Sequence, residues 1–305
     1  MLRAVAREGS LSAAARSLGY TQPAISHHVA KLEDEVGTAL LTRLGRGVQL
    51  TDAGVALVEH TDAVVSRLSA AEEEVAAIAG LRAGRVRLAA FPSGSATLMA
   101  GALTRLRAAH PGIEVSFSEA EPEDSLPLLR AGELDLVLGF SYEAVGVADG
   151  RDFTTIPLLR DPSHAVLPAR HQLAARKRPI QLAALAGESW IAGCERCRAH
   201  LLHVTASAGF VPHIDFATDD YVTVQSLIAA GLGVSLLPAL SLCAVRRDDI
   251  AVRRVAGDPA RTVQVVLPVA ERRPPAVTAT LDALRTAARA VAADGNSAAL
   301  GLRVA

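Results

Sequence analysis

The sequence predicts an α/β protein built in three parts, and three observations support this prediction. Two short amphipathic helices joined by a glycine turn occupy residues 10–33, and a short strand pair follows them. An apolar heptad repeat over residues 57–78 predicts one long helix. From residue 85 onward, short apolar strands alternate with helices, which indicates a parallel sheet covered by helices. With 305 residues, half of them hydrophobic, the chain is long enough for two or three globular domains.

The first two helices predict a helix-turn-helix. The first is expected over residues 12–18, with Ser10 or Ser12 as its N-cap. Gly19 supplies the turn, because a residue without Cβ adopts a positive φ easily. The second helix is expected to begin at Thr21, with a proline in its first turn. The apolar positions expected to pack the two helices together are Ala15, Leu18, Ile25, Val29 and Leu32.

The outward face of the second helix carries the hydrogen-bonding residues Gln22, Ser26 and His27. A helix of this kind fits the major groove of DNA and reads base edges there. Residues 40–51 then form two short apolar stretches around an Arg/Gly turn, which predicts a hairpin, or wing. Arg43 and Arg46 are expected to meet phosphates or the minor groove. The predicted partner is double-stranded DNA.

Charge is distributed unevenly, although the formal net charge of the chain is only −1. Residues 1–51 contain six basic and four acidic residues, whereas residues 52–80 contain one basic and six acidic residues. The first module is therefore the part suited to face phosphates. Because its excess is modest, we expect dimerisation to gather enough phosphate contacts.

The first 54 residues resemble the N-terminal domain of LysR-type transcriptional regulators. The matching residues, at the spacing of that family, are Ala14, Ala15, Leu18, Thr21, Gln22, Pro23, Ala24, Ile25, Ser26, Val29, Leu32, Glu33, Gly37, Leu40, Arg43, Arg46, Leu50, Thr51, Ala53 and Gly54. The resemblance implies DNA contacts by Thr21, Gln22, Pro23, Ser26, His27, Arg43 and Arg46. Two departures stand out: members often carry Arg or Lys where this chain has His27, and Met1 falls inside what should be the first helix.

The heptad repeat of the long helix places apolar side chains four and three residues apart. They are Leu57, Thr61, Val64, Leu68, Ala71, Val75 and Ile78. This seam is typical of a coiled coil, and the acid-rich outer face favours a dimer over a helix lying on its own domain. Gly80 and Gly84 are expected to end the helix and give a hinge. The predicted assembly is a homodimer, and the family resemblance adds a homotetramer made of two dimers.

The remaining chain predicts two lobes joined by two crossovers, with strands over 85–91, 113–117, 134–140, 190–191, 213–216, 234–237 and 262–269. The rhythm is expected to break near 158–161, where two strands of different character follow. This arrangement resembles the two-lobed, periplasmic-binding-protein-like effector domain of the LysR family. The predicted parts are a winged helix-turn-helix domain (1–54), a linker helix (55–83), an effector domain (84–293) and a flexible tail (294–305). Lobe I comprises 84–159 and 266–293, and lobe II comprises 160–265.

Ligands of such sheets bind beyond the carboxyl ends of strands, at helix N-termini. The segment 91–96 is such a place, and Ser93, Gly94 and Ser95 offer hydroxyl and backbone N–H donors for a small-molecule effector. The alternative is an ordinary helix cap. The residues expected to line the same gap from the ends of other strands are Phe140, Gly193, Cys194, Thr218 and Asp219.

A pair of cysteines, Cys194 and Cys197, is followed by His200 and His203. On one helix, steps of three residues rotate by about 300°, so a single ion hardly collects all four ligands. We therefore predict no metal site and no cofactor. Lining of the cleft, thiol-responsive regulation and metal-responsive regulation through Cys194 and Cys197 stay open. Cys243 is expected in the core.

The predicted function is DNA-binding transcriptional regulation controlled by a small-molecule effector held between the two lobes. The chain has no nucleophile elbow, zinc-protease motif or P-loop, so no enzyme activity is expected. A CxxC oxidoreductase and a solute-binding protein with a helical appendage are the alternatives. We expect a cytoplasmic protein without a membrane partner, because no signal peptide is evident and the uncharged stretch 221–245 is interrupted by Gly, Pro and Ser.

Overall fold

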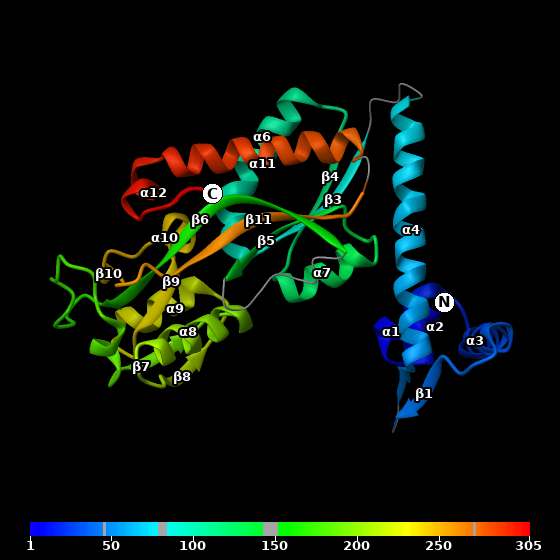
Figure 1. Ribbon diagram of the computed structural model, residues 1–305, viewed down its shortest axis with the longest axis horizontal. Coiled ribbons are helices and arrows are strands. Elements are labelled where there is room, and N and C mark those ends of the chain that lie inside the picture. Colours follow the sequence, from blue (N-terminus) through cyan, green and yellow to red (C-terminus); the bar gives the residue numbers. More distant parts are fainter. Residues whose placement is uncertain (45–46, 79–83, 143–151, 271–272) are drawn as a thin grey trace. The chain divides into compact units, whose positions relative to one another are not determined.

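The computed structural model describes residues 1–44, 47–78, 84–142, 152–270 and 273–305 (Figure 1). It divides into two compact units, an N-terminal and a C-terminal one, which are described separately.

The N-terminal unit is a three-helix domain with a hairpin. Its helices and strands are α1 (Leu2–Glu8), α2 (Leu11–Leu18), α3 (Gln22–Val36), β1 (Leu41–Leu44) and β2 (Gly47–Leu50). The Ser10 hydroxyl accepts a hydrogen bond from the Ala13 N–H, so Ser10 is the N-cap of α2 and Ser12 is not. Gly19 ends this helix with a φ of 69°, as the turn requires.

The predicted packing of α2 on α3 is correct in part. Ala15, Ile25 and Val29 are buried together with residues of α1. Leu18, however, is 39% exposed, and Leu32 is only half-buried. Burial falls along α3 after Val29, where residues 30–36 are exposed or half-buried.

The wing predicted at residues 40–51 is an antiparallel hairpin in which Leu41 pairs with Leu50 and Arg43 with Val48. Arg46, in the turn between these strands, lies outside the described residues. The Thr51 hydroxyl accepts a hydrogen bond from the Gly54 N–H at the start of α4 (Asp52–Ile78). This helix includes residues 55–78 of the predicted linker, and the seam residues Val64, Leu68 and Val75 are 66%, 61% and 66% exposed. Gly80 lies outside the described residues, whereas Gly84 is described.

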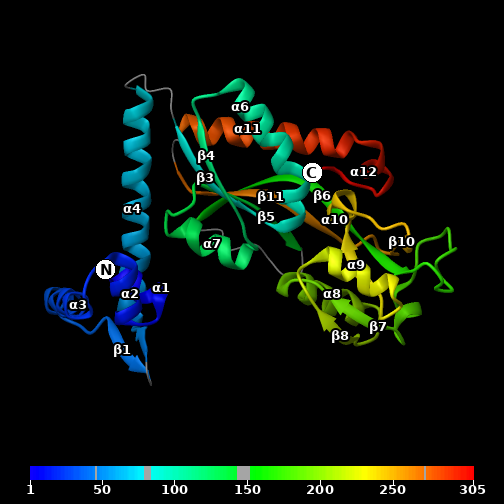
Figure 2. The same cartoon turned by 180° about the vertical axis from the view of Figure 1, so that it is seen from behind.

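Lobe I of the C-terminal unit is a mixed sheet with helices on both faces. Figures 1 and 2 show α6 and α11 on one face and α7 on the other. The strand order is β4-β3-β5-β11-β6, with parallel pairing at β4-β3-β5 and antiparallel pairing beyond. The elements are β3 (Arg85–Ala90), α5 (Pro92–Gly94), a π-helical turn η1 (Ser95–Met99), α6 (Ala100–Ala109), β4 (Glu114–Glu119), α7 (Pro122–Arg130), β5 (Leu136–Tyr142), β6 (Phe153–Pro168), β11 (Ala260–Pro268) and α11 (Pro275–Ala293).

Lobe II is assembled on the second half of β6. This 16-residue strand pairs with β11 through its first half, and with β9 and β10 through its second half. The two strands expected around 158–161 are therefore one continuous strand. The other elements of lobe II are η2 (Leu182–Leu185), β7 (Ser189–Ala192), α8 (Glu195–Ser207), β8 (His213–Ala217), α9 (Tyr221–Ala229), β9 (Ser235–Pro238), α10 (Ala239–Ala244) and β10 (Ile250–Arg254).

Residues 294–305, expected as a flexible tail, form α12 (Gly295–Ala299) and β12 (Arg303–Val304). The Asp294 carboxylate caps α12, and β12 pairs with β6. Leu300 and Leu302 are buried in the main core. This apolar anchoring explains why the tail is ordered, and the prediction of a flexible tail was wrong.

The uncharged stretch 221–245 comprises α9, β9 and α10. Among the described residues, no helix is both long and apolar enough to cross a membrane. The predicted sequence of helix, turn and strand is thus confirmed, although α10 and β10 were not predicted.

Candidate functional site

The N-terminal turn of α3 carries the predicted DNA-contacting residues on its exposed side. Thr21, Gln22, Pro23 and His27 are exposed, and Ser26 is half-buried. The Gln22 Nε2 donates a hydrogen bond of 2.8 Å to the Ser26 Oγ, one helical turn away. Two polar side chains therefore stand side by side where a recognition helix presents its first residues to base edges.

The two predicted wing arginines are less fully described. The backbone of Arg43 lies in β1, but its side chain is outside the described part of the structure, as is all of Arg46. Their contact with DNA therefore stays a prediction.

A second polar site lies in the C-terminal unit, where the strands pass from lobe I to lobe II. Arg261 of β11 pairs with Tyr142 of β5 on one side and with Asp161 of β6 on the other. The Arg261 Nε donates to the Asp161 Oδ2 at 2.8 Å, and both side chains are buried. The other Asp161 oxygen accepts a hydrogen bond of 3.0 Å from the Leu240 N–H at the start of α10. The ion pair thus joins three elements of both lobes.

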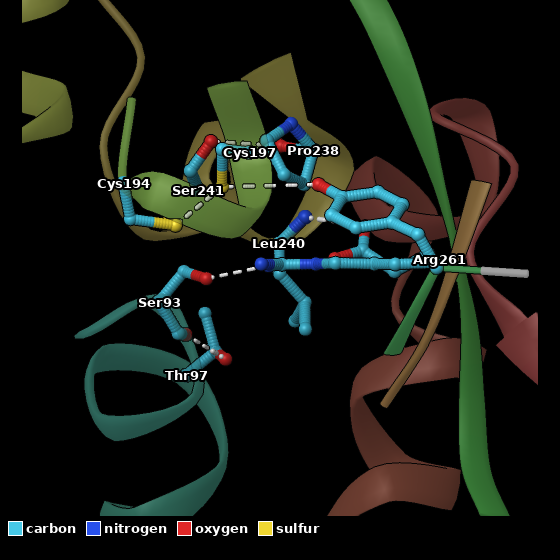
Figure 3. A network of polar contacts seen from close by, with 10 residues as sticks. Ser93, Thr97, Cys194, Cys197, Pro238, Leu240, Ser241 and Arg261 are labelled. Carbon is cyan, nitrogen blue, oxygen red and sulfur yellow. Dashed lines mark hydrogen bonds and ion pairs between the residues drawn. The ribbon is translucent and has the colours of Figure 1, made fainter. Parts of the chain in front are cut away.

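Two aromatic rings and a serine complete the surroundings of this guanidinium. The Arg261 Cζ lies 4.8 Å from the ring centre of Phe91 and 4.4 Å from that of Phe140, within cation–π range. Its Nη2 donates to the Ser93 Oγ at 2.7 Å, as Figure 3 shows. Ser93 and Phe140, two predicted effector residues, therefore meet at Arg261.

The rest of the predicted effector loop is the beginning of a helix. The helix after β3 begins at Pro92, earlier than the predicted residue 96. A Cβ on Gly94 would lie 2.8 Å from the Phe91 ring, so only glycine fits there. The Ser95 hydroxyl donates toward the Ala90 and Phe91 carbonyl oxygens, both at 3.1 Å, so it is bonded to the nearby backbone and does not cap the helix.

Lobe II contributes the cysteine pair. Cys194 is the N-cap residue of α8 and Cys197 lies in its first turn, and the Cys194 Sγ donates to the Cys197 Sγ at 2.7 Å. Tyr142 of lobe I donates through its hydroxyl to the Cys197 Sγ at 3.8 Å. Gly193 lies beside this turn, where an added Cβ would be 3.2 Å from the Cys197 Cβ. The predicted residues Gly193 and Cys194 thus lie beside Cys197, which contacts Tyr142 of lobe I.

Two titratable side chains adjoin the cysteines. Burial raises the pKa of Glu121 to about 7, against the lowering effect of Arg261, and the charges of Glu123 and Asp219 add to the rise. His200 stacks on Tyr142, with ring centroids 3.8 Å apart and planes 10° apart. Burial lowers the pKa of His200 to about 4, with the charges of His203 and Arg261 acting in the same direction. His200 is therefore a neutral ring at physiological pH.

The last two predicted effector residues follow β8. Thr218 is half-buried, and its N–H donates to the Ala192 carbonyl oxygen at 3.1 Å. Asp219 is exposed, and its negative charge contributes to the raised pKa of Glu121. Among the described residues, no group of three or more His, Cys, Asp or Glu side chains could hold a metal ion.

Sequence reasoning missed the residues at the centre of this site, namely Arg261, Asp161, Tyr142 and Glu121. A usable signal existed for two of them. Asp161 and Arg261 are charged residues within strands that also carry apolar runs, and charged side chains are rarely buried unless they are paired.

Two family models and several known regulators match this chain. Residues 1–55 match the family described as "Bacterial regulatory helix-turn-helix protein, lysR family", and residues 79–289 match the "LysR substrate binding domain". The probable HTH-type transcriptional regulator LrrA of Synechococcus elongatus is 28% identical over 97% of this chain and 98% of its own. The hydrogen peroxide-inducible genes activator of Pectobacterium carotovorum is 29% identical over 81% of each chain.

Solved structures share the fold. A full-length OxyR variant from Pseudomonas aeruginosa is 26% identical and superposes with a TM-score of 0.68 over 93% of each chain. Full-length CbnR, solved in complex with its target DNA, is 23% identical, with a TM-score of 0.55 over 94% of this chain and 97% of its own. At that identity, the second similarity shows the fold alone.

Proposed function

This chain belongs to the LysR family of DNA-binding transcriptional regulators, and we propose a separate role for each of its two units. The N-terminal unit reads DNA through α3 and the wing. The C-terminal unit receives a small-molecule effector between its lobes. The relatives are regulators rather than enzymes, and we assign no catalytic reaction to this chain. Because its partner is DNA, we place its action in the cytoplasm.

The hydrogen-bonded pair of Gln22 and Ser26 carries the DNA assignment. It supports a recognition helix that enters the major groove with its first turn. We propose that Gln22 and Ser26 contact base edges, while Thr21, Pro23 and His27 lie against the groove. Arg43 and Arg46 would neutralise phosphates beside it.

Oligomerisation is proposed through α4. Leu68 and two valines of its seam are largely exposed in the single chain, at the spacing that a second helix would cover. A homodimer would place two recognition helices on one duplex, and two such dimers would give the homotetramer of the family resemblance.

The effector is proposed to bind where the lobes share the Arg261 cluster. Ser93, Gly94, Ser95 and Phe140 come from lobe I. The residues of lobe II are Gly193, Cys194, Thr218 and Asp219. An effector that binds one lobe arrangement better than another shifts the population toward it, and so changes how the DNA-binding units are presented.

The experiment that tests the DNA assignment is a footprint on the DNA upstream of the protein's own gene, repeated across a salt series. We expect two protected half-sites and an affinity that falls steeply as salt rises. The Arg46→Ala variant should lower the salt slope by about two per bound dimer, because each protomer loses one phosphate contact. Arg289→Ala, which removes an exposed arginine of α11, serves as the matched control. An unchanged slope for Arg46→Ala would contradict the wing assignment.

Oxidation is a second candidate signal. Several relatives bear the name hydrogen peroxide-inducible genes activator. The observation in this chain that favours such a signal is the 2.7 Å separation of the Cys194 and Cys197 sulfur atoms.

A further inference from the structure

The cysteine pair lies at the beginning of a thirteen-residue helix, directly against lobe I. Cys194 occupies the N-cap of α8 and Cys197 the first turn, so the partial positive charge of the helix N-terminus falls on both sulfur atoms. Both thiols are free, and their sulfur atoms lie 2.7 Å apart.

The two thiols differ in acidity. The hydrogen bond donated by Cys194 lowers the pKa of Cys197 most, and the positive charge of Arg261 acts in the same direction against the cost of burial. The same hydrogen bond, together with burial, raises the pKa of Cys194. The neutral His200 supplies no charge here, so Arg261 is the cation that favours a Cys197 thiolate. Cys197 is thus the nucleophile of the pair, and Cys194 is the thiol that stays protonated.

We propose that Cys194 and Cys197 are a redox-active dithiol that a small hydroperoxide closes to a disulfide, and that Tyr142 and Arg261 transmit its state to lobe I. The proposal deepens the second candidate signal and rests on the proposed function for its output at DNA. A hydroperoxide is the oxidant class that fits, because Cys194 is only 6% exposed and Cys197 half-buried, which excludes bulky oxidants.

The chemistry proceeds in two steps. The Cys197 thiolate attacks the protonated peroxide oxygen; an S–O bond forms, the O–O bond breaks, and the other oxygen leaves and takes a proton from solvent, giving water or an alcohol. The sulfur is oxidised by two electrons and the peroxide reduced by two. The Cys194 sulfur then attacks the Cys197 sulfenic acid; the S–S bond forms, the S–O bond breaks, and the Cys194 proton leaves with the hydroxyl as a second water.

Oxidation changes the contacts that Cys197 makes with Tyr142 and Arg261. In the reduced state the Cys197 sulfur accepts the Tyr142 hydroxyl, and its negative charge faces Arg261. A disulfide removes that charge and weakens the acceptor. Tyr142 and Arg261 lie opposite each other on β5 and β11, and Arg261 also holds Asp161 and Ser93. The loss therefore reaches both lobes through side chains already in contact.

The first test uses the reduced full-length protein, hydrogen peroxide as the probe, and thiol alkylation followed by peptide mass analysis. We expect a disulfide between Cys194 and Cys197, with Cys243 alone left to alkylate. Cys194→Ser should accumulate a sulfenic acid at Cys197, which dimedone traps. Cys197→Ser should leave Cys194 unreacted, and the matched control Cys243→Ser should behave like the wild type. Absence of the disulfide, or dimedone trapped on Cys194 instead, would overturn the proposal.

The second test concerns Arg261 and Tyr142 as positioning residues. Arg261→Gln should shift the pH profile of Cys197 alkylation to higher pH and slow the reaction at neutral pH about tenfold, whereas Arg261→Lys should keep the profile near that of the wild type. Tyr142→Phe should still form the disulfide but no longer change the DNA footprint on oxidation. Equal profiles for the Gln and Lys variants, or an unaltered footprint response in Tyr142→Phe, would refute the assigned roles.

The readouts separate the two levels of the proposal. A protein that binds its DNA in the reduced state yet forms no Cys194–Cys197 disulfide refutes the dithiol and leaves the regulator intact. A protein that forms the disulfide and binds DNA in neither state refutes the proposed DNA assignment instead. Support for both requires a footprint that differs between the two states in the wild type and not in Cys197→Ser.

Discussion

The Asp161 carboxylate and the Arg261 guanidinium form an ion pair with a 2.8 Å contact, and neither side chain is more than 3% exposed. Two buried charges are tolerated when they pair with each other, and here the Leu240 N–H also binds the second Asp161 oxygen while the Ser93 hydroxyl accepts a hydrogen bond from the Arg261 Nη2. The pair therefore fixes the point at which β6 and β11 pass between the lobes.

Breaking this pair from one side should be costly. We expect Arg261→Met to lower the free energy of unfolding by about 3 to 5 kcal/mol, because Asp161 is left buried and unpaired. Urea denaturation followed by circular dichroism measures the effect. The double variant Asp161→Asn with Arg261→Met should recover part of the loss, and Arg247→Met, at an exposed ion pair with Asp249, should change stability little. A single variant as stable as the wild type would contradict the role of the pair.

Specific DNA recognition should depend on Gln22. Gln22→Ala removes the amide that lies beside Ser26, and we expect specific binding to weaken by about 1 to 3 kcal/mol while binding to unrelated DNA stays constant. Fluorescence anisotropy on the footprinted site and on a scrambled duplex gives both values. Gln172→Ala, at an exposed glutamine of lobe II, is the matched control. Equal weakening on both duplexes would show that Gln22 does not read bases.

Dimerisation should depend on the apolar seam of α4. Leu68→Glu places a charge where a second helix would cover the exposed leucine, so the dimer should dissociate at concentrations at which the wild type is assembled. Sedimentation velocity reports the change, and Ala56→Glu on an exposed position outside the seam should leave the assembly intact. If both variants remained assembled, α4 would not be the dimer interface.

Stability should vary with pH through Glu121. Its folded pKa, about 7, lies above its ordinary value of 4.5 because of burial, so its contribution is fully present below pH 4.5 and is lost as pH rises through 7. Glu121→Gln should therefore gain stability relative to the wild type as pH rises from 5 to 8, by up to about 3 kcal/mol. Denaturation at both pH values measures this, with Glu114→Gln on the exposed edge strand β4 as control. A constant difference between wild type and Glu121→Gln would exclude the raised pKa.

Local signals made the N-terminal unit predictable. A cap such as Ser10 and a glycine such as Gly19 act within one turn, so their spacing alone places α2 and α3. Exposure was harder to predict, because the fate of Leu18 depends on how far neighbouring helices extend. The same limit applies to the tail, where burial of Leu300 and Leu302 depends on a core formed by distant segments.

The candidate site in the C-terminal unit was predicted only where it follows strand ends. Ser93 and Cys194 lie at such ends. Ser93 bonds to Arg261, and Cys194 bonds to Cys197, which contacts Tyr142 on the strand beside Arg261. Arg261, Asp161 and Tyr142 meet only because β11 returns antiparallel between β5 and β6, a register that no local pattern encodes. A charged residue within a strand was the available clue, and it does not identify the partner of that charge.

The continuous strand β6 has a mechanical consequence. The same strand is hydrogen-bonded into the sheets of both lobes. The lobes therefore cannot move independently, as they could if a flexible linker joined them. A hydrogen-bonded ribbon resists stretching and shearing far more than it resists torsion. A change at the junction should therefore rotate one lobe relative to the other about the long axis of β6, and it should not open the two lobes like a hinge.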